Sequence, residues 1–195
     1  MDDQRPIKLE RLREIFHKAY YFFLRILFKR YIQNIDKNKT LLVFDIDNTL
    51  ALTRESANQD KRFLDANQNL CDAAAHFLNS DDIVTIFISV RPISEFFKTS
   101  FWLEKNISSS NKKTLFLTRS PQQKINLLHD ITQIKNKLLI DDLSFNIGKE
   151  IMIMHDVLDS INNQNLRYLG LEFINKTKSM EKLEVISLIK NNLIS

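Results

Sequence analysis

Short runs of consecutive apolar residues alternate along the chain with longer segments in which apolar residues recur every three or four positions. Runs of the first kind are typical of strands buried on both faces, and segments of the second kind are typical of helices. Strands that alternate with helices predict right-handed crossovers and a parallel sheet covered on both faces, a Rossmann-like three-layer α/β/α sandwich. The runs are Leu41–Asp45, Ile83–Ile88, Thr114–Leu117 and Lys137–Ile140, and the helical segments between them span about 62–79, 92–105 and 120–134.

Beyond residue 150 the pattern is less regular. It predicts short strands at about 150–154 and 167–174 with a helix between them, and a closing helix from about 178 to 193. A polar stretch at roughly 51–61 is long enough for a small flap only. The sequence shows no repeat, low-complexity tract or linker, so residues 39–195 are expected to form one domain.

Residues 1–38 form a separate element, with an amphipathic helix predicted over about 7–34. Seven of the aromatic residues of the chain lie between Phe16 and Tyr31. So many aromatic rings favour packing against the rest of the domain or against a second copy, so a homodimer through this helix is one expected partner. A membrane surface and nucleic acid are the alternatives. The periodic apolar positions are Leu9, Leu12, Phe16, Ala19, Phe23 and Ile26.

The charge of the chain is concentrated near its start. The net charge is +4, but residues 1–40 alone hold 10 Lys and Arg against 5 Asp and Glu. The basic excess therefore belongs to the helical segment and not to the domain, which weakens the usual link between a basic protein and nucleic acid. The N-terminal sequence predicts neither a signal peptide nor a membrane-spanning helix. We expect a cytoplasmic protein, with export by a signal-less route as the alternative.

Glycine and cysteine content excludes several common sites. With only Gly148 and Gly170, the chain cannot contain a dinucleotide-binding G-x-G-x-x-G, a P-loop or a G-x-S-x-G nucleophile elbow. The single cysteine, Cys71, excludes an intrachain disulfide and any multi-cysteine metal centre, and it suits a reducing compartment. Carboxylates are therefore the most informative polar groups.

Four carboxylates stand where apolar strands stop. Asp45 and Asp47 follow the first strand, and Asp141 and Asp142 follow the fourth. The carboxyl ends of parallel strands share one edge of a sheet, so these side chains are expected to converge there. Carboxylates that close repel one another unless a cation lies among them, and hard oxygen ligands favour magnesium. The sequence therefore predicts a magnesium site at this edge.

Four motifs occur in order along residues 40–148. They are the D-x-D-x-T segment Asp45–Thr49 at the end of the first strand, Ser89 at the end of the second, Lys124 in the helix after the third, and Asp141–Asp142 at the end of the fourth. In this arrangement the chain resembles the haloacid dehalogenase (HAD) superfamily of phosphoaspartate-forming phosphohydrolases. The resemblance implies the HAD fold and magnesium-dependent hydrolysis of phosphate monoesters.

The resemblance also implies a role for each acidic residue. Asp45 would be the nucleophile that attacks phosphorus, and Asp47 would protonate the leaving oxygen and then activate water. Magnesium would be held by the side chain of Asp45, the main-chain carbonyl of Asp47 and the carboxylate of Asp142. Asp141 would support the metal from the outer shell.

Other polar residues gain roles from the same resemblance. Ser89 would donate its hydroxyl to the transferring phosphoryl group, and Lys124 would neutralise the charge of the nucleophile and the phosphate. Thr49, which closes the first motif, and Arg119, just past the third strand, are expected to bind substrate.

A finer similarity lies after the second strand. The segment Ser89–Pro92, followed by Thr99 and Trp102–Leu103, is similar to the S/T-x-R-P…T…W-L pattern of HAD phosphatases that include polynucleotide 3′-phosphatases and some acid phosphatases. This similarity implies that Arg91 reaches the phosphate or the substrate. The segment Leu138–Leu143 is similar to that of nucleotidase members.

The spacing of the motifs leaves no room for a folded cap domain. Thr49 and Ser89 are 40 residues apart, Ser89 and Lys124 are 35 apart, and each interval must also supply core helices or strands. The resemblance then implies a capless enzyme that acts on a large or macromolecular substrate, or on a nucleotide. The alternative is a catalytically degenerate HAD-fold module that binds or regulates.

Overall fold

A five-stranded parallel sheet forms the centre of the protein. The computed structural model describes residues 5–52, 61–147, 150–162 and 166–194. The strand order across the sheet is β5-β4-β1-β6-β9, and every neighbouring pair is parallel. The strands are β5 (Thr114–Thr118), β4 (Ile83–Val90), β1 (Thr40–Phe44), β6 (Lys137–Ile140) and β9 (Arg167–Leu169).

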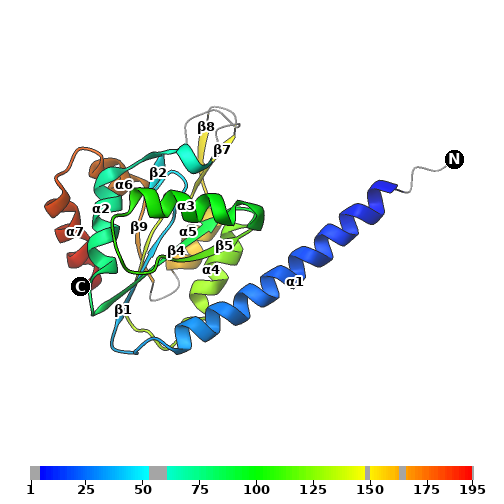
Figure 1. Cartoon of the computed structure of the whole chain (residues 1–195), viewed down its shortest axis with the longest axis horizontal. Coiled ribbons are helices and arrows are strands. Elements are labelled where there is room, and N and C mark those ends of the chain that lie inside the picture. Colours follow the sequence, from blue (N-terminus) through cyan, green and yellow to red (C-terminus); the bar gives the residue numbers. More distant parts are fainter. Residues whose placement is uncertain (1–4, 53–60, 148–149, 163–165, 195) are drawn as a thin grey trace.

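Helices cover both faces of this sheet (Figure 1). Alternate residues of β1 enter two separate cores, because successive side chains of a strand point to opposite faces. Leu42 and Phe44 pack with one set of helices, and Leu41 and Val43 pack with the other. The first set is α2 (Gln68–Leu78), α3 (Phe96–Asn106), α6 (Leu171–Thr177) and α7 (Lys182–Ile194), and the second is α1 (Arg5–Gln33), α4 (Pro121–His129) and α5 (His155–Asn162).

The predicted three-layer α/β architecture is confirmed. All four apolar runs are strands of the sheet, and each buries side chains on both faces. Two small antiparallel hairpins lie outside the sheet, at the end where its strands stop. They are β2 (Ala51–Leu52) with β3 (Asp65–Ala66), and β7 (Ser144–Ile147) with β8 (Glu150–Ile153). The polar flap predicted over 51–61 falls mostly on residues 53–60, which lie outside the described residues.

The helix predicted over 62–79 is wrong over residues 62–67. These residues lie in a 3₁₀ turn, η1 (Lys61–Phe63), in the short strand β3 and in the positions beside them, so α2 begins only at Gln68. Tertiary contacts explain the difference, because Leu64 is buried and its carbonyl accepts a hydrogen bond of 2.8 Å from the indole of Trp102.

Four other predicted boundaries also differ, and one of them is the start of the closing helix predicted from about 178, which begins at Lys182. The segment 92–105 opens with a 3₁₀ turn, η2 (Ile93–Glu95), and the helix predicted to 134 ends at His129. The strand predicted over 167–174 stops at Leu169, which pairs with Ile140, the last residue of β6. Because no further strand positions are available there for pairing, the apolar residues that follow form α6 instead.

The helix α1 packs on the domain as predicted, but not through the predicted positions, because Leu12, Phe16 and Phe23 are exposed. Leu24, Phe28 and Ile32 are buried, and the Phe28 ring meets Phe116 edge to face at 4.9 Å. The Tyr20 hydroxyl donates a hydrogen bond of 2.9 Å to the carbonyl of Leu117. The N-terminal half of α1 runs away from the body of the protein (Figure 1). None of the helices within the described residues is long and apolar enough to cross a membrane.

An ion pair ties α1 to the end of α4. Arg25 donates two hydrogen bonds to the carboxylate of Asp130, and the Lys29 ammonium lies 3.6 Å from it. The hydrogen bond from Arg25 lowers the pKa of Asp130, although burial opposes this. Because the pKa of Asp130 is lower in the folded protein than in the unfolded chain, the pair stabilises the fold at pH values above the unfolded-state pKa. This stabilisation is lost as the pH falls through the folded-state pKa.

Asp130→Asn is therefore expected to reduce the free energy of unfolding by only about 0.5–1 kcal/mol at neutral pH, because Arg25 is half exposed. The measurement is urea unfolding of both proteins at several pH values. The difference should shrink toward zero as the pH falls below about 4. Asp81→Asn, at an exposed position, is the matched control. A difference that persists in acid would show that the ion pair is not its source.

Candidate active site

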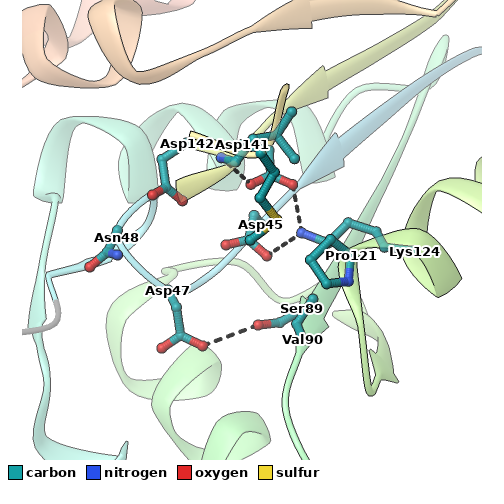
Figure 2. Close-up of a pocket in the computed structure, with 11 residues that line it drawn as sticks. Asp45, Asp47, Asn48, Ser89, Val90, Pro121, Lys124, Asp141 and Asp142 are labelled. Carbon is teal, nitrogen blue, oxygen red and sulfur yellow. Dashed lines mark hydrogen bonds and ion pairs between the residues drawn. The ribbon is translucent and has the colours of Figure 1, made fainter. Parts of the chain in front are cut away.

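The acidic residues predicted from the strand ends meet at one edge of the sheet. Asp45 follows β1 and Asp141 follows β6, and these strands pair so that Phe44 lies beside Ile140. One carboxylate oxygen from each of Asp45, Asp141 and Asp142 lies within 4.8 Å of the others, and all three residues are buried. The predicted convergence is confirmed for these three residues (Figure 2).

Lys124 lies between two of these carboxylates. Its ammonium donates hydrogen bonds of 2.5 Å to Asp45 Oδ1 and 2.6 Å to Asp141 Oδ2, and only 2% of the residue is exposed (Figure 2). The first turn of α4 positions it, since this helix starts directly after β5, at the same edge of the sheet. The helix begins at Pro121. The Ser120 hydroxyl caps this end by accepting a hydrogen bond from the amide of Gln123.

Burial and charge shift the ionisation of this cluster. Burial raises the pKa of the Asp45 carboxyl well above its usual range; the Lys124 ammonium opposes this, and the neighbouring carboxylates add to it. Burial would by itself lower the pKa of Lys124, but Asp141 and Asp45 raise it above its usual range. The lysine therefore stays charged, and further positive charge near Asp45 would favour the ionised form of its carboxyl.

Backbone contacts hold Asp141 and Asp142 in place. The amide of Leu143 donates to Asp141 Oδ1 at 2.9 Å, and Leu143 has a φ of 45°, a left-handed conformation that is strained for a branched side chain. The amide of Asp142 donates to the hydroxyl of Thr49 at 3.2 Å. The sequence predicts that Thr49 binds substrate. In the structure Thr49 is completely buried, and its hydroxyl contacts the backbone amide of Asp142.

Asp47 lies on the other side of the cavity and is held by Arg91. The guanidinium of Arg91 donates from Nε and from a terminal nitrogen to the two oxygens of Asp47, both at 2.7 Å, and its other terminal nitrogen donates to Thr99 at 2.9 Å. Ser89 Oγ lies 3.3 Å from Asp47 (Figure 2). Arg91 is 3% exposed, so its contacts are with Asp47 and Thr99, and its predicted contact with substrate stays a prediction.

A cavity of about 390 Å³ joins these groups. The predicted residues that line it are Asp45, Asp47, Ser89, Lys124, Asp141 and Asp142. Sequence reasoning missed Asn48, Val90, Pro121, Leu143 and Met154. Asn48 has a φ of 58°, and an Asn that follows a strand-end Asp is a signal for such a turn. Arg119 is exposed and does not line the cavity; its amide bonds to the side chain of Gln123.

The donor set fits a divalent cation. Three buried carboxylates face a single buried ammonium, so a charge of +2 would balance them, and carboxylate oxygens are the ligands that hard cations prefer. Both oxygens of Asp141 already accept hydrogen bonds, from Lys124 and from the amide of Leu143. Of the two carboxylate oxygens of Asp45, only Oδ1 accepts a hydrogen bond from Lys124.

Comparison of the chain with protein-family models, with curated proteins and with solved structures found no match. The geometry of the site and the order of its motifs are therefore the features that indicate a function.

Proposed function

We propose that the protein is a magnesium-dependent phosphomonoester hydrolase of the HAD type that works through a phosphoaspartate on Asp45. The observation that carries this proposal is the placement of Asp45 at the centre of the site. Its carboxylate accepts a hydrogen bond from Lys124 and lies beside the carboxylates of Asp141 and Asp142, on a cavity that Asp47 and Ser89 also line. A carboxylate that contacts a fixed cation and also belongs to a group of possible metal ligands suits attack on an anionic phosphate.

Asp45 and Asp142 would hold the magnesium ion directly, together with the main-chain carbonyl of Asp47. Asp141 would act from the outer shell, because its two oxygens are engaged by Lys124 and by the amide of Leu143. When bound, the ion neutralises charge on the phosphate and screens it from the carboxylates.

In the first step, a carboxylate oxygen of Asp45 attacks phosphorus while the bond from phosphorus to the ester oxygen breaks. The leaving oxygen takes a proton from Asp47, and the phosphoryl group remains on Asp45 as an acyl phosphate. Lys124 offsets the negative charge that collects between Asp45 and the phosphate, and the Ser89 hydroxyl donates to the phosphoryl oxygens.

In the second step, Asp47 accepts a proton from a water molecule that attacks the phosphorus of the acyl phosphate. The bond between phosphorus and Asp45 breaks, which releases inorganic phosphate and restores both carboxyl groups. The two hydrogen bonds from Arg91 fix the orientation of the Asp47 carboxylate.

The shape of the site supports a substrate that lies largely outside the cavity. A volume of about 390 Å³ is at the small end for ligand pockets. The only element within the described residues between the first two motifs and outside the core layers is the β2–β3 hairpin with its 3₁₀ turn. A phosphate group on a nucleotide or on a larger molecule suits such an open site.

The test is hydrolysis of 4-nitrophenyl phosphate by the full chain. Turnover is expected with magnesium, is expected to fall to background with a chelator, and is expected to return when magnesium is restored, because the uncompensated carboxylates repel an anionic substrate. Bis(4-nitrophenyl) phosphate, a diester with the same leaving group, is the control and should not be hydrolysed. Turnover that persists with the chelator would contradict the proposed metal requirement.

A further inference from the structure

The helix α1 carries a second apolar face that points away from the domain. Six large apolar side chains on it are 53% to 70% exposed, and we call them the outer stripe. They recur at spacings of one, three, four and seven residues, so they share one side of the helix. The buried residues Leu24, Phe28 and Ile32 occupy the opposite side. The outer stripe is Leu12, Ile15, Phe16, Phe22, Phe23 and Leu27.

Basic residues border the outer stripe. Lys18 is three residues after Ile15 and four before Phe22, so helical periodicity places it beside the stripe, and it is exposed. Arg30, also exposed, continues the line of the stripe one turn after Leu27. The segment Arg5–Gln33 contains eight Lys and Arg against two Asp and Glu. The surface is therefore both apolar and positively charged.

We propose that the outer stripe binds the surface of an anionic lipid bilayer, with α1 lying in the plane of the headgroups. A basic helix with large apolar and aromatic side chains along one side fits that location. The stripe extends for about 22 Å along the helix axis. Because the described helices are not apolar enough to cross a bilayer, α1 would lie on the surface and not span it.

The charge pattern favours lipid over a second copy of the chain. Only Glu14 is acidic between Leu12 and Arg30, so two outer stripes packed together would bring several basic side chains side by side with Glu14 as the only acidic partner. An anionic headgroup layer supplies the opposite charge along the whole helix.

Contacts with the domain present the stripe in a fixed orientation. The Arg25–Asp130 ion pair and the Tyr20 hydrogen bond hold the other side of α1 against α4 and the end of β5. The proposal concerns where the protein binds and does not depend on the proposed reaction.

The test is flotation of the full chain with vesicles of phosphatidylcholine, with and without phosphatidylglycerol. We expect the protein to float with the anionic vesicles, to float weakly with the neutral ones, and to be released by high salt. The double variant Phe16→Ser/Phe23→Ser should reduce the bound fraction about tenfold or more. The matched control is Phe97→Ser/Phe101→Ser, which removes two exposed phenylalanines from α3 (83% and 52% exposed) and should bind as the native chain does.

Circular dichroism and thermal unfolding of both variants show whether each is folded. Absence of the native chain from anionic vesicles would overturn the proposal, as would an equal loss in the α3 control. The native chain could instead be a dimer that binds no vesicles, with Phe16→Ser/Phe23→Ser a monomer. That result would assign the stripe to contact with a second copy. Binding to an oligonucleotide but not to vesicles would assign it to nucleic acid.

Discussion

Asp45→Asn is expected to abolish phosphate hydrolysis, with a loss of about 10⁴-fold or more in kcat, while the protein stays folded. The substitution keeps the shape of the side chain but replaces the attacking oxygen anion with a neutral amide. Magnesium affinity should fall as well, because the cluster loses one of its three carboxylates. The measurement is the rate of 4-nitrophenyl phosphate hydrolysis at saturating magnesium, with magnesium binding followed by calorimetry.

Urea unfolding of Asp45→Asn shows whether a loss of activity comes from the missing carboxylate or from a disturbed fold. Burial raises the pKa of Asp45, and a raised carboxyl pKa means that ionisation of Asp45 destabilises the fold as the pH rises through that value. The neutral amide removes this penalty, so metal-free Asp45→Asn should unfold at no lower urea concentration than the native chain.

The control is Asp72→Asn on the outer side of α2, which should keep full activity. If Asp45→Asn kept more than a tenth of the native rate, the phosphoaspartate route would be wrong. If the native chain bound magnesium but hydrolysed no phosphate ester, the site would belong to a binding or regulatory module.

The sequence predicted the parts of the site that follow from strand ends. Apolar runs located β1 and β6, and the residues after them, Asp45 and Asp141, had to share an edge because parallel strands end together. Lys124 could be placed near that edge because it lies in the first turn after β5. These inferences needed only the order of elements and the direction of the strands.

Contacts set by side-chain geometry could not be predicted in this way. Nothing in the pattern indicated that both oxygens of Asp47 would bond to Arg91, or that the Thr49 hydroxyl would accept the Asp142 amide. Helical periodicity predicted α1 but not which of its apolar residues face the domain, because the segment is apolar on two sides. That choice depends on the surface of α4 and β5, which is assembled only in the folded chain.

Lys124→Met is expected to lower the free energy of unfolding of the metal-free protein by about 3–5 kcal/mol at neutral pH. The ammonium is the only cation bonded to Asp45 and Asp141 within the described residues, and all three groups are buried. Methionine fills similar space but leaves two buried carboxylates without their counter-charge. Activity should fall by about 10²-fold or more, because the charge that collects on Asp45 and the phosphate is no longer offset.

Lys113→Met is a closely matched control for this loss. The Lys113 side chain is also only 3% exposed, but its ammonium bonds to Glu104, whose side chain is 62% exposed and can be solvated when the pair is broken. This control should lose about 1 kcal/mol or less. Magnesium should restore part of the stability of Lys124→Met, since a divalent cation among the three carboxylates replaces the missing positive charge. Equal losses in the two variants, or no recovery with magnesium, would show that Lys124 contributes through packing and not through the charge balance of the site.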